Sequence, residues 1–127
     1  MNLLKSREIK QILKIAKRNP NLIAIILFGS YAKKTQKETS DIDLCIIRKK
    51  DSMPYDFNEL NFISKYIDIV FFDSLPDYIK FRIFSEGQIL VLNDEIIYKR
   101  IKLSFLHIYR DNYFYRLKQQ QKQMAMI

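Results

Sequence analysis

The chain of 127 residues contains one cysteine, two glycines, three prolines and no tryptophan. The single cysteine, Cys45, excludes an internal disulfide, and its place in an apolar run is typical of a buried, inert thiol. The scarcity of glycine and proline, with 48% apolar residues, excludes a disordered or fibrous chain. The longest apolar run, Leu22–Phe28, is far shorter than the roughly 20 residues that a membrane helix needs. The sequence therefore predicts a globular protein without a membrane span, folded as a single domain over residues 1–127.

The N-terminal segment lacks the continuous apolar stretch and the small-residue cleavage site of a signal peptide, so we expect a cytoplasmic protein. The chain has fewer acidic than basic residues: 14 Asp and Glu compared with 22 Lys and Arg, which gives a formal net charge of +8. This excess favours an acidic or phosphate-bearing partner, although the lysines are spread along the chain as on solvated helix faces. We expect no direct binding of nucleic acid.

The apolar pattern predicts strands that alternate with helices. Helical spacing extends from Leu3 to Lys17, and Asn19-Pro20 ends that helix. Further helices are expected over 58–65, from a start at Ser74 and Asp77 to about residue 86, where Gly87 ends it, and from about 94 to 120. Strands are expected at "NLIAIILF", "DIDLCIIRK", "YIDIVFFD" and "QILVLND". This order predicts an α+β fold, a small mixed β-sheet with helices packed on it.

Three aspartates are candidates for a metal site. Asp41 and Asp43 are two residues apart in a predicted strand, so both project from one face and repel each other unless a cation or water lies between them. Asp68 lies within the apolar run "YIDIVFFD", where a lone charge is costly. If the two strands are neighbours, the three carboxylates converge. Such hard oxygen ligands suit Mg²⁺ or Mn²⁺.

Gly29 and Ser30 follow the first predicted strand directly. We expect the chain to turn there into a short helix, which aims backbone N–H groups and a positive helix end at an anion. Gly29 permits a close approach of the backbone, and the Ser30 hydroxyl adds a donor. A phosphate-binding site that faces a divalent-metal site is typical of enzymes that catalyse phosphoryl or nucleotidyl transfer.

The spacing of these residues resembles the polymerase-beta-like nucleotidyltransferase superfamily, in particular the minimal nucleotidyltransferases that are paired with HEPN proteins as antitoxins. The family pattern is Gly-Ser, ten residues, then Asp-x-Asp. This chain has Gly29-Ser30, residues 31–40, and Asp41-Ile42-Asp43, followed later by Asp68. The resemblance covers about Leu3 to Phe72 and implies the polymerase-beta-like nucleotidyltransferase fold.

The resemblance also implies roles for single residues. Asp41 and Asp43 would bind two Mg²⁺ ions, and Asp68 would complete the catalytic metal site and help to deprotonate the attacking hydroxyl. Gly29 and Ser30 would hold the terminal phosphates of an NTP. The implied reaction is Mg²⁺-dependent transfer of an NMP, with AMP from ATP favoured, to a tyrosine hydroxyl of a cognate HEPN toxin, which the protein would neutralise as an antitoxin.

Two other functions stay open. The protein could neutralise a HEPN ribonuclease by contact alone, or it could transfer a nucleotide to a small molecule. Retention of Asp41, Asp43 and Asp68 favours an enzyme, because an abandoned site has no need to hold three like charges together. The predicted C-terminal helix has more aromatic residues than one core-facing stripe uses, so part of it is expected to be an interface. The sequence leaves the oligomeric state open.

Overall fold

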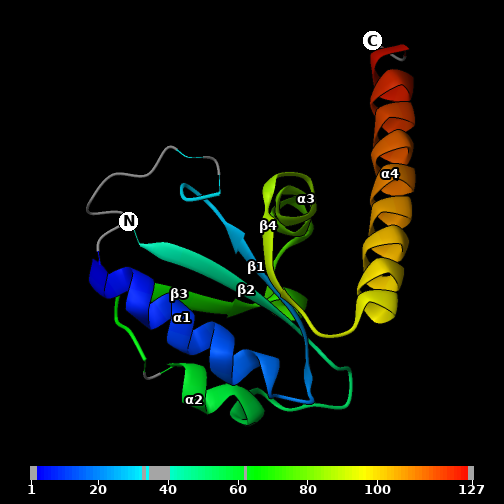
Figure 1. Ribbon diagram of the computed structural model, residues 1–127. Helices are drawn as coiled ribbons and strands as arrows, with labels where there is room; N and C mark the ends of the chain where they lie inside the picture. Colours follow the sequence, from blue (N-terminus) through cyan, green and yellow to red (C-terminus); the bar gives the residue numbers. More distant parts are fainter. Residues whose placement is uncertain (1–2, 33, 35–40, 62, 126–127) are drawn as a thin grey trace.

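The computed structural model describes residues 3–32, 34, 41–61 and 63–125 (Figure 1). Its elements follow in the order α1 (Leu3–Lys17), β1 (Leu22–Phe28), β2 (Ile42–Arg48), a 3₁₀ turn (Pro54–Phe57), α2 (Asn58–Asn61), β3 (Ile67–Phe71), a second 3₁₀ turn (Phe72–Ser74), α3 (Asp77–Glu86), β4 (Gln88–Leu92) and α4 (Glu95–Ala125).

The four strands form one mixed sheet in the order β3-β2-β1-β4. β1 pairs antiparallel with both β2 and β4, whereas β2 and β3 are parallel. A parallel pair requires a crossover connection, and residues 49–66, which include α2, provide it. The predicted α+β fold with a small mixed sheet is confirmed.

Helices cover both faces of the sheet (Figure 1). α1 and α2 pack on one face, where Ile12 and Leu60 join Leu44 and other strand residues in a buried cluster. α3 and α4 pack on the opposite face, where Phe84 and Tyr98 join a second cluster that contains Cys45. The strands are apolar on both sides because each face is covered.

The limits of three helices differ from those predicted. α2 ends at Asn61, and the Ser64 hydroxyl then accepts a hydrogen bond from the Tyr66 N–H at 3.0 Å, which turns the chain into β3. Ser74 does not cap α3, because its hydroxyl donates to the Phe71 carbonyl at 2.9 Å and Pro76 occupies the cap position. Gly87 ends α3 as predicted.

α4 is longer than the predicted 94–120 helix and has two parts. It begins after Asp94, whose carboxylate accepts a hydrogen bond from the Ile97 N–H at 3.1 Å. Its first turns pack on the body of the protein, and the last aromatic contact with α3 is the stack of Phe81 on Tyr109 at 4.8 Å between ring centroids. The outer half then projects away from the sheet (Figure 1).

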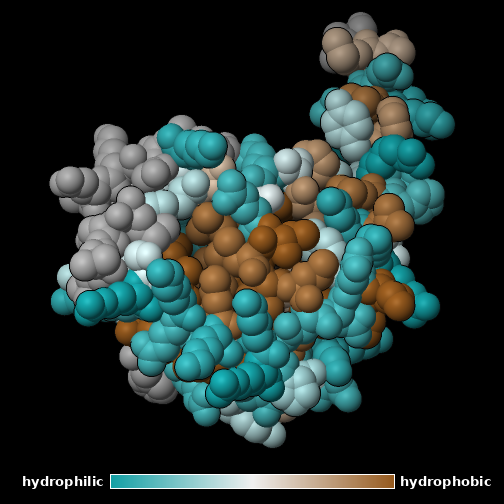
Figure 2. All heavy atoms as spheres, viewed as in Figure 1, coloured by the Kyte–Doolittle hydropathy of each residue, from teal (hydrophilic) through white to brown (hydrophobic). Residues whose placement is uncertain are grey.

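Apolar side chains are also visible outside the two clusters. Figure 2 shows an apolar patch over β1 and β4, surrounded by hydrophilic groups. Ile89 and Leu92 of the edge strand β4 are 45% and 39% exposed. In the described part of the chain, no helix is long and apolar enough to cross a membrane.

Candidate active site

Asp43 and Asp68 lie side by side on neighbouring strands. Asp43, the second residue of β2, is in register with Asp68, the second residue of β3, across the parallel pair. Because side chains alternate along a strand, Asp43 is on the same face of the sheet as Cys45, the face covered by α3 and α4. Asp43 is half-buried and Asp68 is exposed. The sheet thus joins two carboxylates that are 25 residues apart in the sequence.

Asp41 directly precedes β2. The strand begins at Ile42, one residue later than predicted, so Asp41 lies just outside the paired part of the sheet. Its side chain is exposed. The chain is fixed at this point by the Ile42 N–H, which donates to the Tyr66 carbonyl at 3.0 Å. Asp41 is therefore close to Asp43 along the chain but outside the strand pairing that joins Asp43 and Asp68, the acidic pair.

The pKa of Asp43 is raised above its ordinary value. Burial is the largest cause, and the negative charges of Asp68 and then Asp41 add to it. The other two carboxylates, Asp68 and Asp41, are thus close enough to oppose the ionisation of Asp43. A cation between them would remove that opposition.

Gly29 meets Asp43 from the end of β1. Its φ angle is +73°, a left-handed conformation that favours glycine. A Cβ atom added there would lie 2.5 Å from Oδ2 of Asp43. Two separate features therefore require glycine at position 29: the positive φ angle, and the lack of space for a side chain beside the Asp43 carboxylate.

The predicted helix after Gly29-Ser30 is not found in the described residues. Residues 29–32 and 34 form turns, and the Lys34 N–H donates to the Tyr31 carbonyl at 3.3 Å. In these described residues, anion binding would rest on the backbone of the turn and not on a helix dipole. The Tyr31 side chain is buried in the cluster under α1, which anchors the turn beside the acidic pair. Most of the spacer before Asp41, residues 35–40, lies outside the described part.

The carboxylates fit a hard divalent cation in chemical type and in charge. Among the described residues, however, no group of three His, Cys, Asp or Glu side chains is placed to hold a metal ion. The structure brings Asp43 and Asp68 into register and leaves Asp41 outside the sheet. The electrostatic strain on Asp43 is the feature that a divalent cation would relieve, and carboxylate oxygens are suitable ligands. The metal-binding role of Asp41, Asp43 and Asp68 stays a prediction.

Cys45 takes no part in this site. It is fully buried, and burial raises its pKa to about 12, so the reactive thiolate does not form near neutral pH. The predicted burial of this thiol is confirmed.

Sequence and structure comparisons identify the family. The family model described as "Polymerase beta, Nucleotidyltransferase" matches residues 10–96. A protein of Methanocaldococcus jannaschii named "Putative protein adenylyltransferase MJ1547" is 33% identical over 90 residues, which are 71% of each chain. A second from this organism, "Putative protein adenylyltransferase MJ1217", is 54% identical over 43 residues, which are 31% of this chain and 44% of that protein.

Two solved structures share the fold. A chain of the structure titled as a toxin-antitoxin with AMP-PNP aligns with a TM-score of 0.67 and 21% identity, over 93% of this chain and 97% of that one. A chain of a Shewanella oneidensis structure, titled as a tri-AMPylated HEPN toxin in complex with an MNT antitoxin, aligns with a TM-score of 0.64 and 20% identity, over 96% and 99%. From the family match, the curated relatives and the shared fold, we conclude that the chain belongs to the polymerase-beta nucleotidyltransferase family.

Proposed function

We propose that the protein is a Mg²⁺-dependent adenylyltransferase that moves AMP from ATP to a tyrosine hydroxyl of a HEPN toxin and so acts as its antitoxin. The observation that carries this proposal is the pairing of Asp43 with Asp68 beside Gly29. The names of the curated relatives support protein adenylylation. The similar fold of a chain in the complex of a tri-AMPylated HEPN toxin with an MNT antitoxin supports a HEPN toxin as the acceptor.

In the proposed reaction, the tyrosine oxygen attacks the α-phosphorus of ATP. The bond from that phosphorus to the oxygen bridging to the β-phosphate breaks, and pyrophosphate leaves. Asp68, which is exposed, accepts the hydroxyl proton from the solvent side. The turn at Gly29 and Ser30 holds the terminal phosphates, so that the leaving group is in line with the attacking oxygen.

Asp41, Asp43 and Asp68 would hold the Mg²⁺ ions. When bound, the ions neutralise phosphate charge and lower the pKa of the attacking hydroxyl. The half-buried Asp43 is fixed in position by the sheet and by Gly29, whereas the exposed Asp41 can adjust to the nucleotide. Asp43 would thus be the rigid metal ligand and Asp41 the adaptable one.

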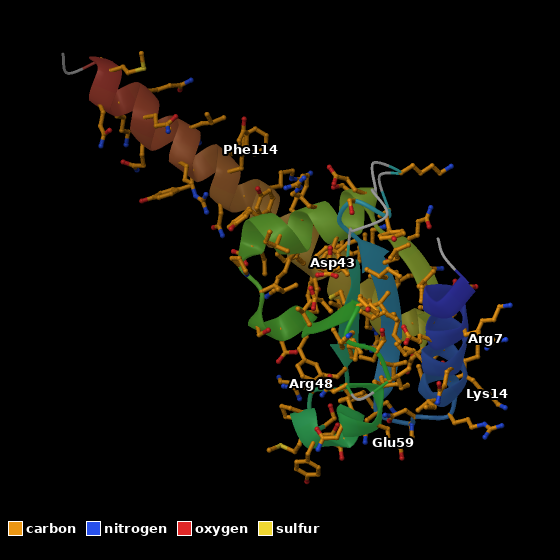
Figure 3. All side chains as sticks on the ribbon, turned by 90° about the vertical axis from the view of Figure 1, so that its left-hand side faces the viewer. Arg7, Lys14, Asp43, Arg48, Glu59 and Phe114 are labelled. Atoms are coloured by element: carbon orange, nitrogen blue, oxygen red, sulfur yellow. The ribbon has the colours of Figure 1, made fainter. Side chains whose placement is uncertain are left out.

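The outer half of α4 is the proposed docking site for the toxin. Over residues 110–125 it contains four Lys or Arg residues and one Asp. It also exposes Tyr113, Phe114 and Tyr115 by 53–64%. Figure 3 shows Phe114 far from the sheet, on the projecting part of the helix. A basic, aromatic surface of this kind fits an acidic partner with an apolar centre.

This exposed helix also supports the alternative that the protein neutralises its toxin by contact. Transfer to a small molecule is the other alternative, and the exposed aromatic surface of α4 favours a protein acceptor over it.

Co-expression with the HEPN toxin of a neighbouring gene tests the proposal. The wild type should restore growth and add AMP groups to the toxin, visible by intact mass. Asp43→Asn should bind the toxin but neither modify it nor restore growth. Asp77→Asn, which changes an exposed carboxylate in the first turn of α3, is the matched control and should behave as the wild type. If Asp43→Asn restores growth fully, contact alone neutralises the toxin.

A further inference from the structure

A cavity of about 620 Å³ lies at the end of β2 opposite to the acidic pair. Asp43 and Arg48 are five residues apart on this strand, about 17 Å at the usual rise of a strand. Figure 3 shows the two side chains at opposite ends of β2. The volume is within the range of about 300–1,000 Å³ that is typical of small-molecule sites. The cavity is therefore separate from the candidate active site and large enough for a ligand.

The interior of this cavity is apolar and comes from four parts of the fold. Its apolar lining consists of Ile23 of β1, Ile47 of β2, Phe72 of the second 3₁₀ turn, and Ile97 and Ile101 of α4. Ile23 and Ile47 are buried in the sheet, whereas Ile97 and Ile101 are half-buried. The first turns of α4 thus form one wall of the cavity and the sheet forms another.

The charged residues of the cavity are predominantly cationic. Arg48, Lys49, Lys50 and Lys80 oppose Asp51 and Asp73, which leaves two net positive charges. Arg48 and Asp73 neutralise each other through an ion pair of 2.7 Å. Within the described residues, none of the three lysines forms a salt bridge.

Lys80 is the best placed of these lysines. It is half-buried, and its Nζ lies 5.0 Å from the centroid of the Phe72 ring. The ring face and the ammonium group are thus adjacent in the lining. A ligand that presents an anionic group to Lys80 can place its apolar part against Phe72 and Ile101.

We propose that this cavity is a second binding site, which takes a small organic anion with an aromatic or branched apolar body. The isoleucine and phenylalanine side chains contact the apolar body, and Lys80, with the lining residues Lys49 and Lys50, holds the anionic group. The site is independent of the proposed transfer reaction, because none of its lining residues belongs to the turn at Gly29 or to the acidic pair.

8-Anilinonaphthalene-1-sulfonate tests this proposal, since it is an aromatic anion of suitable size. NMR of the full chain with labelled isoleucine methyl groups locates the probe. The methyl signals of Ile23, Ile47, Ile97 and Ile101 should shift on titration. Those of Ile12 and Ile25, buried on the opposite face, should not. Shifts at Ile108 on the exposed part of α4 instead of at the cavity would overturn the proposal.

Affinity measurements test the role of the charge. Lys80→Gln should weaken binding of the probe at least fivefold, whereas Lys118→Gln, the same change on the outer half of α4, should leave it within twofold. N-Phenyl-1-naphthylamine, which lacks the sulfonate, should bind at least fivefold more weakly than the probe. Equal binding by the uncharged compound, or unchanged binding in Lys80→Gln, would refute the anion site. Displacement of the probe by Mg²⁺-ATP would show that the cavity is not a separate site.

Discussion

Gly29 and Asp43 lie so close together that a Cβ atom on Gly29 would be 2.5 Å from Oδ2 of Asp43. The contact joins the turn after β1 to the second residue of β2. Asp43 is in turn in register with Asp68 of β3. A displacement of the Asp43 carboxylate therefore changes the geometry of the acidic pair.

Gly29→Ala should abolish nucleotidyl transfer and destabilise the fold. The substitution forces an L-residue to a φ of +73°, which costs about 1–3 kcal/mol, and pushes a methyl group against the Asp43 carboxylate. Chemical denaturation measures the loss of stability, and incorporation of labelled AMP measures the activity. In an Asp43→Ala background the stability cost should be smaller, since Oδ2 is gone. An equal cost in both backgrounds would contradict the steric contact.

The stability of the metal-free protein should depend on the titration of Asp43. Burial and the charges of Asp68 and Asp41 raise its pKa in the folded state, so the folded protein holds this proton more tightly than the unfolded chain does. The resulting stabilisation is fully present below the ordinary carboxyl pKa of about 3.9 and is lost as pH rises through the raised value.

The free energy of unfolding of the wild type, in chelator, should therefore fall relative to that of Asp43→Asn as pH rises from about 4 towards neutrality. The amide cannot ionise, so the variant should be the more stable protein at neutral pH. Added Mg²⁺ should reduce this gap by stabilising the wild type. A gap that does not change with pH would show that Asp43 is not under electrostatic strain. Asp43→Asn should also lower transfer of AMP by about a hundredfold or more.

Binding of the nucleotide should require both a divalent cation and Ser30. Ser30→Ala removes a hydroxyl that we expect to donate to a phosphate, and such a bond to a charged group is worth about 1.5–3 kcal/mol. Calorimetry should therefore show affinity for Mg²⁺-ATP that is at least about tenfold weaker. The wild type should bind ATP poorly in excess chelator. Equal affinity with and without the cation would refute the metal-binding role of the carboxylates.

Arg48→Ala should destabilise the protein by about 1–2 kcal/mol. The guanidinium forms the ion pair with Asp73, donates to the Ser52 carbonyl and lies 5.5 Å from the centroid of the Phe71 ring. The cost stays modest because the side chain of Asp73 is 54% exposed, which weakens the ion pair. Thermal and chemical denaturation measure the change. Arg82→Ala, which removes an exposed pair with Glu86 at 3.7 Å, should cost less than about 0.5 kcal/mol.

The sequence alone was sufficient to predict the strands and to single out Gly29, Asp43 and Asp68 as candidates, because apolar runs and fixed spacings are local signals. It also predicted the end of α3 at Gly87, where the cap N–H donates to the Ile83 carbonyl. The family followed from the same spacing. The roles of the aspartates and of Ser30 stay predictions that the experiments above address.

Features that depend on distant contacts could not be predicted. The register that pairs Asp43 with Asp68 depends on the crossover of residues 49–66, which no local pattern specifies. The turn after Gly29 replaced an expected helix, since the Lys34 N–H bonds to Tyr31 and the Tyr31 side chain is held in the core. The cavity beside Lys80 exists only because α3, α4 and the loop after β2 meet there.

The position of β3 at an edge of the sheet makes it easier to separate than the central strands. It pairs only with β2, whereas β1 and β2 are each paired on both sides. Local opening of an edge costs less free energy than global unfolding, so amides of β3 should exchange with solvent before those of β1. When β3 separates from β2, Asp68 moves away from Asp43. The carboxylate pair can therefore be lost under mild denaturing conditions that leave most of the fold intact.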